Sequence, residues 1–121
     1  MISRDEILMG RDKEFPLSAE LEENLANLLV AVNKLRDLYG KPMYVSSGYR
    51  PGHYNTDAGG AKNSTHCLCM AVDFHDQDNA LKNWITVDIL EQCGLYQEDP
   101  KRTLTWLHVQ TRVTHNRVFV P

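Results

Sequence analysis

The stretch STHCLCMAVDF, residues 64–74, decides how this chain can fold. Its apolar run from Cys67 to Phe74 predicts a short buried strand. One carboxylate, Asp73, stands in that run, and a buried carboxylate is costly unless it is paired or binds a metal. His66 lies just before the same run, so its imidazole and the carboxylate of Asp73 can converge on one point.

A second informative stretch, TWLHVQ, occupies residues 105–110. Strand alternation places His108 on the face opposite to Leu107 and Val109, beside the indole of Trp106. Two histidines and one carboxylate, with a fourth position open to water, are the composition of a catalytic zinc site. The candidate zinc ligands are therefore His66, Asp73 and His108.

The N-terminal third of the chain predicts one long helix. Ser18 is a suitable N-cap, and Gly40 followed by Pro42 ends the helix. Apolar residues recur at helical spacing and should face the core, namely Leu21, Leu25, Leu28, Leu29, Val32 and Leu35. The first ten residues are expected to be irregular or to form a short helix.

Between this helix and the buried strand, residues 43–50 predict a short strand that runs into a loop. Residues 51–64 are rich in Gly, Asn, Ala and Asp, with Gly59 and Gly60 at the centre. A loop of this length in a compact domain is more often functional than idle. The loop is therefore a candidate part of the functional site.

The C-terminal half predicts a second helix over Asn79–Cys93, with Asp78 as its N-cap and Gly94 as its end. Residues 95–97 and 103–113 then resemble the two arms of a β-hairpin.

Residues 117–121 are expected to form a short tail. These elements predict a single α+β domain over residues 1–121, with a small, mainly antiparallel sheet and flanking helices.

Composition and charge exclude several classes of protein. The chain has 121 residues, of which 42% are apolar and 24% charged, typical of one soluble domain. A formal charge of -3 predicts no nucleic-acid partner. No stretch approaches the roughly 20 apolar residues of a membrane span. The first residues, MISRDE, lack a signal-peptide pattern, and three cysteines fit a reducing compartment. We therefore expect synthesis in the cytoplasm, and no pattern indicates an oligomeric state.

Four motifs occur in the order typical of one enzyme family. They are SSGYR at 46–50, GGAKNSTH at 59–66, AVDF at 71–74 and WLHV at 106–109. In this order the chain resembles the M15 metallopeptidases over roughly residues 42–113. That family comprises D-Ala-D-Ala carboxypeptidases, dipeptidases and L-alanyl-D-glutamate endopeptidases, several of them phage endolysins. It shares its zinc-binding fold with the hedgehog signalling domain.

The resemblance implies roles for particular residues. It makes His66, Asp73 and His108 ligands of Zn²⁺, and bacterial peptidoglycan stem peptides the substrate. Arg50 would bind a substrate carboxylate or stabilise the developing oxyanion, and Ser64 would help to fix the ligand loop. Independently of the family pattern, His53 is a candidate to line the substrate cleft and Trp106 a candidate to stack on the substrate.

The sequence departs from the family pattern at three positions. The family often has glycine three residues after the first histidine, where this chain has Cys69. The general base is commonly an acid three residues before the last histidine, where this chain has Thr105. Some relatives carry an acid two residues after that histidine, where this chain has Gln110. The nearest substitutes are Glu98 and Asp99 at the hairpin turn, and we favour Asp99 because Pro100 would fix its backbone.

Two alternatives remain open at this stage. Cys67 and Cys69 flank the first histidine, and thiolates are also good zinc ligands. Because the usual acid is missing at Thr105, the chain could instead be a non-catalytic zinc-binding domain, such as a phage structural or wall-binding protein. A wall enzyme made without a signal peptide would reach its substrate through a holin or inside a virion.

Overall fold

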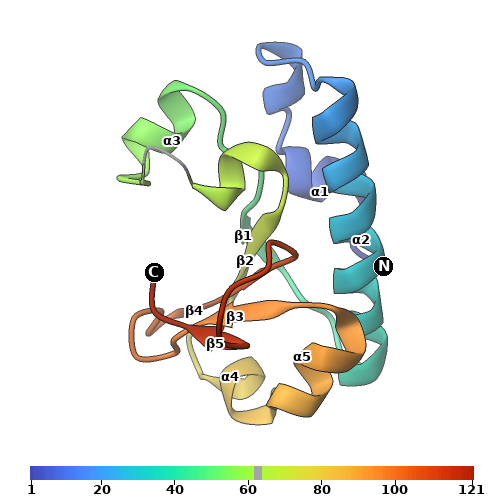
Figure 1. The fold of residues 1–121 in the computed structure, drawn as a ribbon, viewed down its shortest axis with the longest axis vertical. Helices are drawn as coiled ribbons and strands as arrows, with labels where there is room; N and C mark the ends of the chain where they lie inside the picture. Colours follow the sequence, from blue (N-terminus) through green and yellow to red (C-terminus); the bar gives the residue numbers. More distant parts are fainter. Residues whose placement is uncertain (62–63) are drawn as a thin grey trace.

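The structure is a computed structural model that describes residues 1–61 and 64–121. Lys62 and Asn63, which belong to the motif at 59–66, lie outside the described residues. The expected α+β class is confirmed, because the described residues form helices and a five-stranded mixed sheet (Figure 1).

The helices are α1 (Arg4–Leu8), α2 (Ala19–Tyr39), α3 (His53–Asp57), α4 (Ala80–Trp84) and α5 (Val87–Cys93), with 3₁₀ turns η1 (Arg11–Lys13) and η2 (Thr65–Leu68). The strands are β1 (Val45–Ser47), β2 (Ala71–His75), β3 (Tyr96–Glu98), β4 (Trp106–Gln110) and β5 (Val118–Phe119). Their order in the sheet is β1-β2-β4-β3-β5, and only the β3–β5 pair is parallel.

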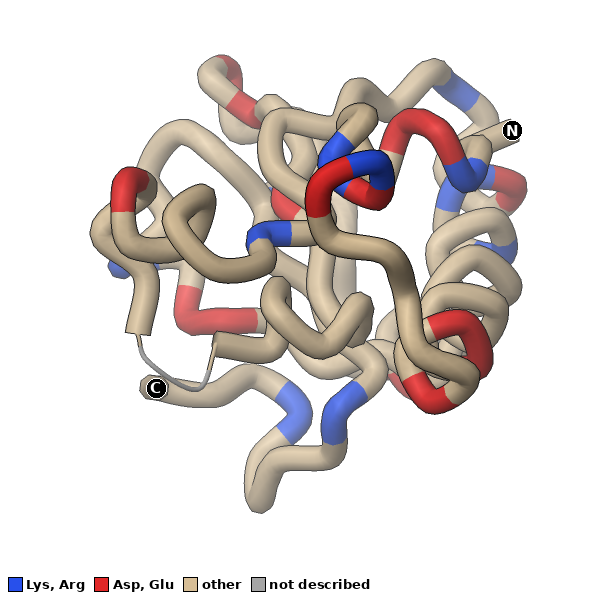
Figure 2. Tube along the Cα trace, turned by 90° about the horizontal axis from the view of Figure 1, so that it is seen from above, with Lys and Arg blue, Asp and Glu red and all other residues tan. Residues whose placement is uncertain are grey.

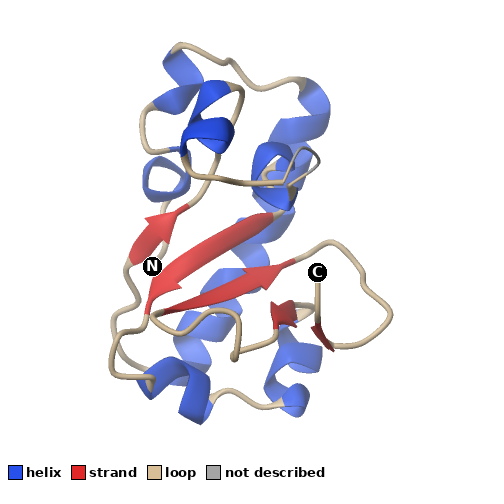
Figure 3. Ribbon diagram, turned by 90° about the vertical axis from the view of Figure 1, so that its left-hand side faces the viewer, coloured by secondary structure: helices blue, strands red, loops and turns tan. Residues whose placement is uncertain are grey.

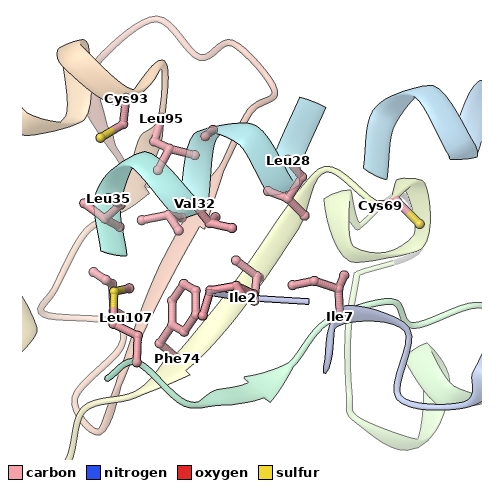
Figure 4. Close-up of a cluster of buried hydrophobic side chains, with 14 of the residues drawn as sticks. Ile2, Ile7, Leu28, Val32, Leu35, Cys69, Phe74, Cys93, Leu95 and Leu107 are labelled. Atoms are coloured by element: carbon pink, nitrogen blue, oxygen red, sulfur yellow. The ribbon is translucent and has the colours of Figure 1, made fainter. Parts of the chain in front are cut away.

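Helix α2 covers one face of this sheet, as Figure 3 shows. The Ser18 hydroxyl accepts a hydrogen bond from the Leu21 N–H, and Gly40 ends the helix in the left-handed conformation, so both predicted ends are confirmed. The predicted apolar face is also confirmed. Figure 4 shows Leu28, Val32 and Leu35 facing the side chains of the sheet.

Alternation along β2 and β4 separates a core face from an open face. Val72 and Phe74 of β2 are fully buried in the core, together with Leu107 and Val109 of β4. The residues between them point the other way. In the antiparallel register Asp73 pairs with His108, so both lie side by side on the face that α2 does not cover.

The predicted strand over residues 67–74 begins later than expected. Thr65–Leu68 forms the 3₁₀ turn η2, and Cys69 ends that turn in the left-handed conformation at φ 56°. A left-handed residue cannot continue an extended strand. The strand β2 therefore starts at Ala71.

The predicted helix over Asn79–Cys93 is two helices. Ile85 is extended, and the Thr86 hydroxyl accepts from the Ile89 N–H as the N-cap of α5. At the start of α4 Asp78 does accept from the Ala80 N–H, but the next two N–H groups donate to Asp76.

The C-terminal hairpin is confirmed, since β3 and β4 pair antiparallel. Residues 117–121 are more than a tail, because β5 within them pairs with β3. The loop at 51–64 also contains a helix, α3. The expected short helix near the N-terminus is α1.

The distribution of charged positions along the chain agrees with the small net charge. Acidic and basic positions are interspersed along the trace (Figure 2). Within the described part of the chain, none of the helices is both long enough and apolar enough to cross a bilayer.

Candidate metal centre

A cleft of about 830 Å³ opens on the face of the sheet that α2 leaves uncovered. Its walls come from the loop before η2, from β4, from β3 and from the C-terminal segment. His66, Asp73 and His108 all line it, although each is buried. Three groups that can bind a metal therefore lie at a cavity that is open to solvent.

The three side chains converge on one point. One potential ligand atom from each of His66, Asp73 and His108 lies within 4.8 Å of the other two. The Oδ1 atom of Asp73 is 2.9 Å from His108 Nδ1 and 3.4 Å from His66 Nε2. The two imidazole rings meet edge to face, with 5.1 Å between centroids. Two nitrogens and one carboxylate, with an open side, fit a catalytic zinc ion.

The backbone directly after β1 sets the orientation of His66. His66 Nδ1 lies 2.9 Å from the carbonyl oxygen of Gly48, a pure acceptor, so Nδ1 carries the proton. That leaves Nε2 free to face Asp73. Gly48 is required here, because a Cβ at this position would lie 2.1 Å from the carbonyl oxygen of Ile7. The neighbouring Tyr49 N–H donates to that same oxygen at 2.8 Å, which holds the loop in place.

Asp73 and His108 are electrostatically coupled. Burial by itself would raise the pKa of Asp73, but hydrogen bonds from His108 and His66 hold that pKa well below its usual range. Burial would likewise lower the pKa of His108, while the hydrogen bond to Asp73 raises it above its usual value. An ionised carboxylate is therefore favoured at the centre of the group, as a metal ligand requires.

A family model supports the chemistry that this geometry suggests. The model described as Peptidase M15 matches residues 4–110 of the 121. The chain belongs to the peptidase M15 family. Comparison with curated proteins and with solved structures gave no match.

Three of the four residues predicted to bind substrate in this M15 member line the cleft, namely Arg50, Ser64 and Trp106. Ser64 contacts both the ligand loop and Arg50. Its hydroxyl accepts from the His66 N–H at 3.2 Å and from Arg50 Nη2 at 3.3 Å, so it ties the ligand loop to the arginine. The Nε atom of Arg50 is buried and has no hydrogen-bond partner among the described residues.

His53, the fourth, is not among the described residues that line the cleft. Its ring is about half exposed, and Nε2 lies 2.9 Å from Glu14 Oε1. The ring also packs against Phe15 and Tyr54. The ring of His53 therefore contacts Glu14, Phe15 and Tyr54 rather than the three residues of the candidate metal site.

The two candidate acids differ in their placement. Glu98 lines the cleft and is only partly exposed. The register of β3 on β4 pairs Gln97 with Val109, so Glu98 comes level with His108. Asp99 does not line the cleft. The Oδ1 atom of Asp99 accepts from the Lys101 N–H at 3.0 Å, and the Asp99 N–H donates to the Phe119 carbonyl oxygen. Both contacts hold Asp99 in the turn.

Two contributors to the cleft were missed by sequence reasoning. Gln110 is buried, and its Oε1 lies 2.8 Å from His108 Nε2. Phe119 of β5 meets His108 edge to face, with 6.0 Å between centroids. Strand alternation puts Gln110 on the same face as His108, and this signal could have indicated it. Phe119 could be found only from the pairing of β5 with β3.

The two cysteines beside His66 are not part of this group. Among the described residues, the cluster that could hold a metal comprises the two histidines and Asp73. The Cys67 thiol donates to the Arg50 carbonyl oxygen at 3.1 Å. Cys69 is fully buried, and burial raises its pKa to about 12, so it stays a neutral thiol.

Proposed function

We propose that this chain is a zinc-dependent peptidase that hydrolyses peptide bonds in the stem peptides of bacterial peptidoglycan. The observation that carries the proposal is the convergence of His66, Asp73 and His108 at the cleft of an M15 family member. The resemblance of its motifs to wall-cleaving peptidases supports the substrate class.

In this proposal His66, Asp73 and His108 hold the zinc ion. A zinc ion in such a site polarises the scissile carbonyl and lowers the pKa of water toward about 7. The protein fixes the two imidazoles beforehand, because the ring nitrogens that face away from Asp73 bind Gly48 O and Gln110 Oε1. Such outer contacts orient ligands and tune their basicity.

Glu98 is the residue we propose as general base. Asp73, His108 and Glu98 follow one another across β2, β4 and β3 on one face of the sheet. A carboxylate in that row, at the cleft, can accept a proton from the attacking water and return it to the leaving amine. Asp99 is engaged in the turn, which is why we now prefer Glu98 to it.

Arg50 is the residue we propose to bind a carboxylate of the stem peptide. It lines the cleft, and its buried Nε leaves one edge of the guanidinium with unsatisfied hydrogen-bonding capacity. A guanidinium pairs with a carboxylate through two parallel hydrogen bonds, which gives both affinity and geometry. Trp106 would form an aromatic wall beside the peptide.

The test combines metal content with cleavage of purified peptidoglycan fragments. We expect about one zinc per chain in the native protein, and loss of that zinc in His66→Ala and His108→Ala. Glu98→Gln should keep the zinc and lose about 100- to 10,000-fold in rate. Asp99→Asn is the matched control, with a rate close to that of the native protein. A native protein that binds no zinc, or cleaves no fragment, would contradict the proposal.

One observation favours a second candidate function. The position three residues before His108 is Thr105, where the family commonly has its acid, and its backbone carbonyl accepts from the Asp76 N–H in a purely structural contact. A zinc-binding protein that holds wall fragments without cleaving them is the alternative. Stoichiometric zinc and fragment binding with no turnover, in native protein and Glu98→Gln alike, would support this alternative.

A further inference from the structure

Gln110 ends β4 inside the cleft, where every polar atom of its side chain has a protein partner. Only about 3% of the residue is exposed. Its Oε1 lies 2.8 Å from His108 Nε2 and 3.1 Å from the Thr65 hydroxyl. Its Nε2 donates to the Arg112 carbonyl oxygen at 3.2 Å. A buried amide with all these contacts is held in one orientation.

The contact with Arg112 decides which way the amide faces. A backbone carbonyl oxygen only accepts, so the NH₂ group of Gln110 must point to it. The opposite orientation would bring two carbonyl oxygens together and leave both unpaired. The Oε1 atom therefore faces His108, and since this oxygen also only accepts, His108 Nε2 must be the donor.

The proton at Nε2 determines which ring nitrogen of His108 can bind a metal. When a metal replaces the proton at Nδ1, the imidazole is neutral and its remaining proton is at Nε2. Nδ1 is also the nitrogen that lies 2.9 Å from Asp73 Oδ1, on the side of the other ligands. His66 has the reverse arrangement, since Gly48 binds its Nδ1 and leaves Nε2 for the centre.

We propose that Gln110 is a positioning residue that fixes the ring orientation and tautomer of His108, so that Nδ1 is presented to the metal. This inference rests on the proposed metal site. Gln110 also connects the two ligand-bearing segments, because the Thr65 hydroxyl that donates to it precedes His66 in η2. It stands where some relatives carry an acid, and it acts here through His108 rather than on the substrate.

A glutamine suits this position better than a carboxylate would. A glutamate could accept from His108 and Thr65, but it could not donate to the Arg112 carbonyl oxygen. Gln110→Glu should therefore keep the acceptor for His108 but place a carboxylate oxygen against the Arg112 carbonyl oxygen. Gln110→Leu removes the acceptor for His108 altogether, and the ring is then free to turn.

The test measures zinc affinity by competition with a chelator, using the full chain. Loss of an outer contact of this kind typically costs about 10- to 100-fold in metal affinity, which we expect for Gln110→Leu. Gln110→Glu should keep most of the zinc affinity that Gln110→Leu loses. Gln92→Leu makes the same chemical change at an exposed site on α5 and should bind zinc like the native protein.

Nitrogen-15 NMR of the zinc-loaded native protein is the second measurement. We expect a proton on His108 Nε2 and the metal at Nδ1. Metal at Nε2, or a Gln110→Leu variant with native zinc affinity, would overturn the inference. If Gln110→Leu does not fold, as far-UV circular dichroism would show, the NMR assignment of the native protein decides.

Failure of the proposed zinc site can be distinguished from failure of the contact between Gln110 and His108. In that case the native protein takes up no zinc, and the role toward the metal is overturned with it. The metal-free native protein should still show a His108 Nε2 proton that exchanges slowly with water. A rapidly exchanging proton there would overturn the orienting contact itself.

Discussion

Asp73 lies directly opposite His108 in adjacent antiparallel strands, and its Oδ1 accepts a hydrogen bond from His108 Nδ1 at 2.9 Å. This pair should contribute to the pH dependence of the stability of the metal-free protein. The lowered pKa of Asp73 means that its contribution to stability is present above about pH 4, the unfolded pKa, and is lost as pH falls below it toward the folded value. The raised pKa of His108 means that its contribution is present below about pH 6.5 and is lost as pH rises through the folded pKa.

Without metal, the melting temperature should therefore be highest between about pH 4 and 6.5 as far as this pair is concerned. Thermal melts in a chelator from pH 3 to 9 would measure it. Asp73→Asn should flatten the decline on both sides, because the asparagine neither ionises nor holds a proton on His108. An unchanged profile in that variant would show that other groups control the pH dependence.

A buried ion pair at the far end of β2 should carry much of the stability around the site. Lys82 Nζ lies 2.8 Å from Asp76 Oδ2, and both side chains are almost fully buried. Nζ also donates to the Trp106 carbonyl oxygen, which links α4 to β4. Removing one partner leaves a buried charge without its counterion, so Asp76→Ala should lower the free energy of unfolding by about 3–5 kcal/mol.

Urea denaturation of the metal-free protein would measure this loss. Asp78→Ala is the matched control, because the exposed Asp78 accepts only one backbone N–H, and its loss should cost about 1 kcal/mol. The double variant of Asp76→Ala and Lys82→Met should be more stable than Asp76→Ala alone. Equal losses for the two aspartates would contradict the role of the ion pair.

Gly48 should be intolerant of any side chain. A Cβ there would meet the Ile7 carbonyl oxygen at 2.1 Å. Gly48→Ala must therefore push the backbone that follows β1 away from α1. We expect a loss of about 1–3 kcal/mol in the free energy of unfolding, and weaker zinc binding as well, since His66 is oriented by Gly48 O.

The comparison is Gly59→Ala, at a glycine of positive φ with open space around it. That change should cost about 1–2 kcal/mol of stability from backbone strain. It should leave zinc affinity unchanged. Gly48→Ala with native zinc affinity would show that the carbonyl does not orient His66.

The sequence predicted local features where one residue determines the outcome. Ser18 and Gly40 mark the ends of α2 because capping chemistry is local. The convergence of His66, Asp73 and His108 followed from alternation in two strands and from the order of the family motifs. The helix ends need no knowledge of strand pairing, and at the three ligands the order of the family motifs takes the place of that knowledge.

Features that depend on the exact register between strands could not be predicted. Glu98 and Asp99 are equivalent as sequence, and only the register of β3 on β4 brings Glu98 level with His108. The break at Ile85 was also missed, because the apolar pattern continues through it while Thr86 starts a new helix. Long-range pairing and competing caps are tertiary effects that a local pattern does not contain.

Cys69 should tolerate glycine, the residue that the family often has at this position. It sits at φ 56°, which costs a side-chain-bearing residue about 1–2 kcal/mol. Glycine would relieve that strain but lose a buried side chain worth a similar amount, so Cys69→Gly should stay within about 1 kcal/mol of the native stability.

Cys69→Ala keeps the strain and loses the sulfur, so it should be less stable than Cys69→Gly. Both variants should bind zinc as tightly as the native protein, because the thiol is buried and neutral. Urea denaturation with a zinc competition assay would test this. A loss of zinc in either variant would show that Cys69 contributes to the metal site.

Arg50 should determine which peptides are accepted. Its Nη2 donates to the Ser64 hydroxyl at 3.3 Å, and its Nε is buried without a partner among the described residues. A lysine would keep the charge but lose the two-pronged geometry. Hydrogen bonds to charged groups contribute about 1.5–3 kcal/mol, so Arg50→Lys should raise KM for peptides with a free carboxylate by about 10- to 100-fold.

Steady-state cleavage of matched free-acid and amidated peptides would measure the effect. The native protein should prefer the free acid, while Arg50→Lys should lose most of that preference with zinc content unchanged. Ser64→Ala is the companion variant, and its smaller effect on KM would separate the arginine's contact with substrate from its anchoring by Ser64. If Arg50→Lys discriminates between the two peptides as the native protein does, the carboxylate must be bound elsewhere in the cleft, and Arg112 is another arginine that lines it.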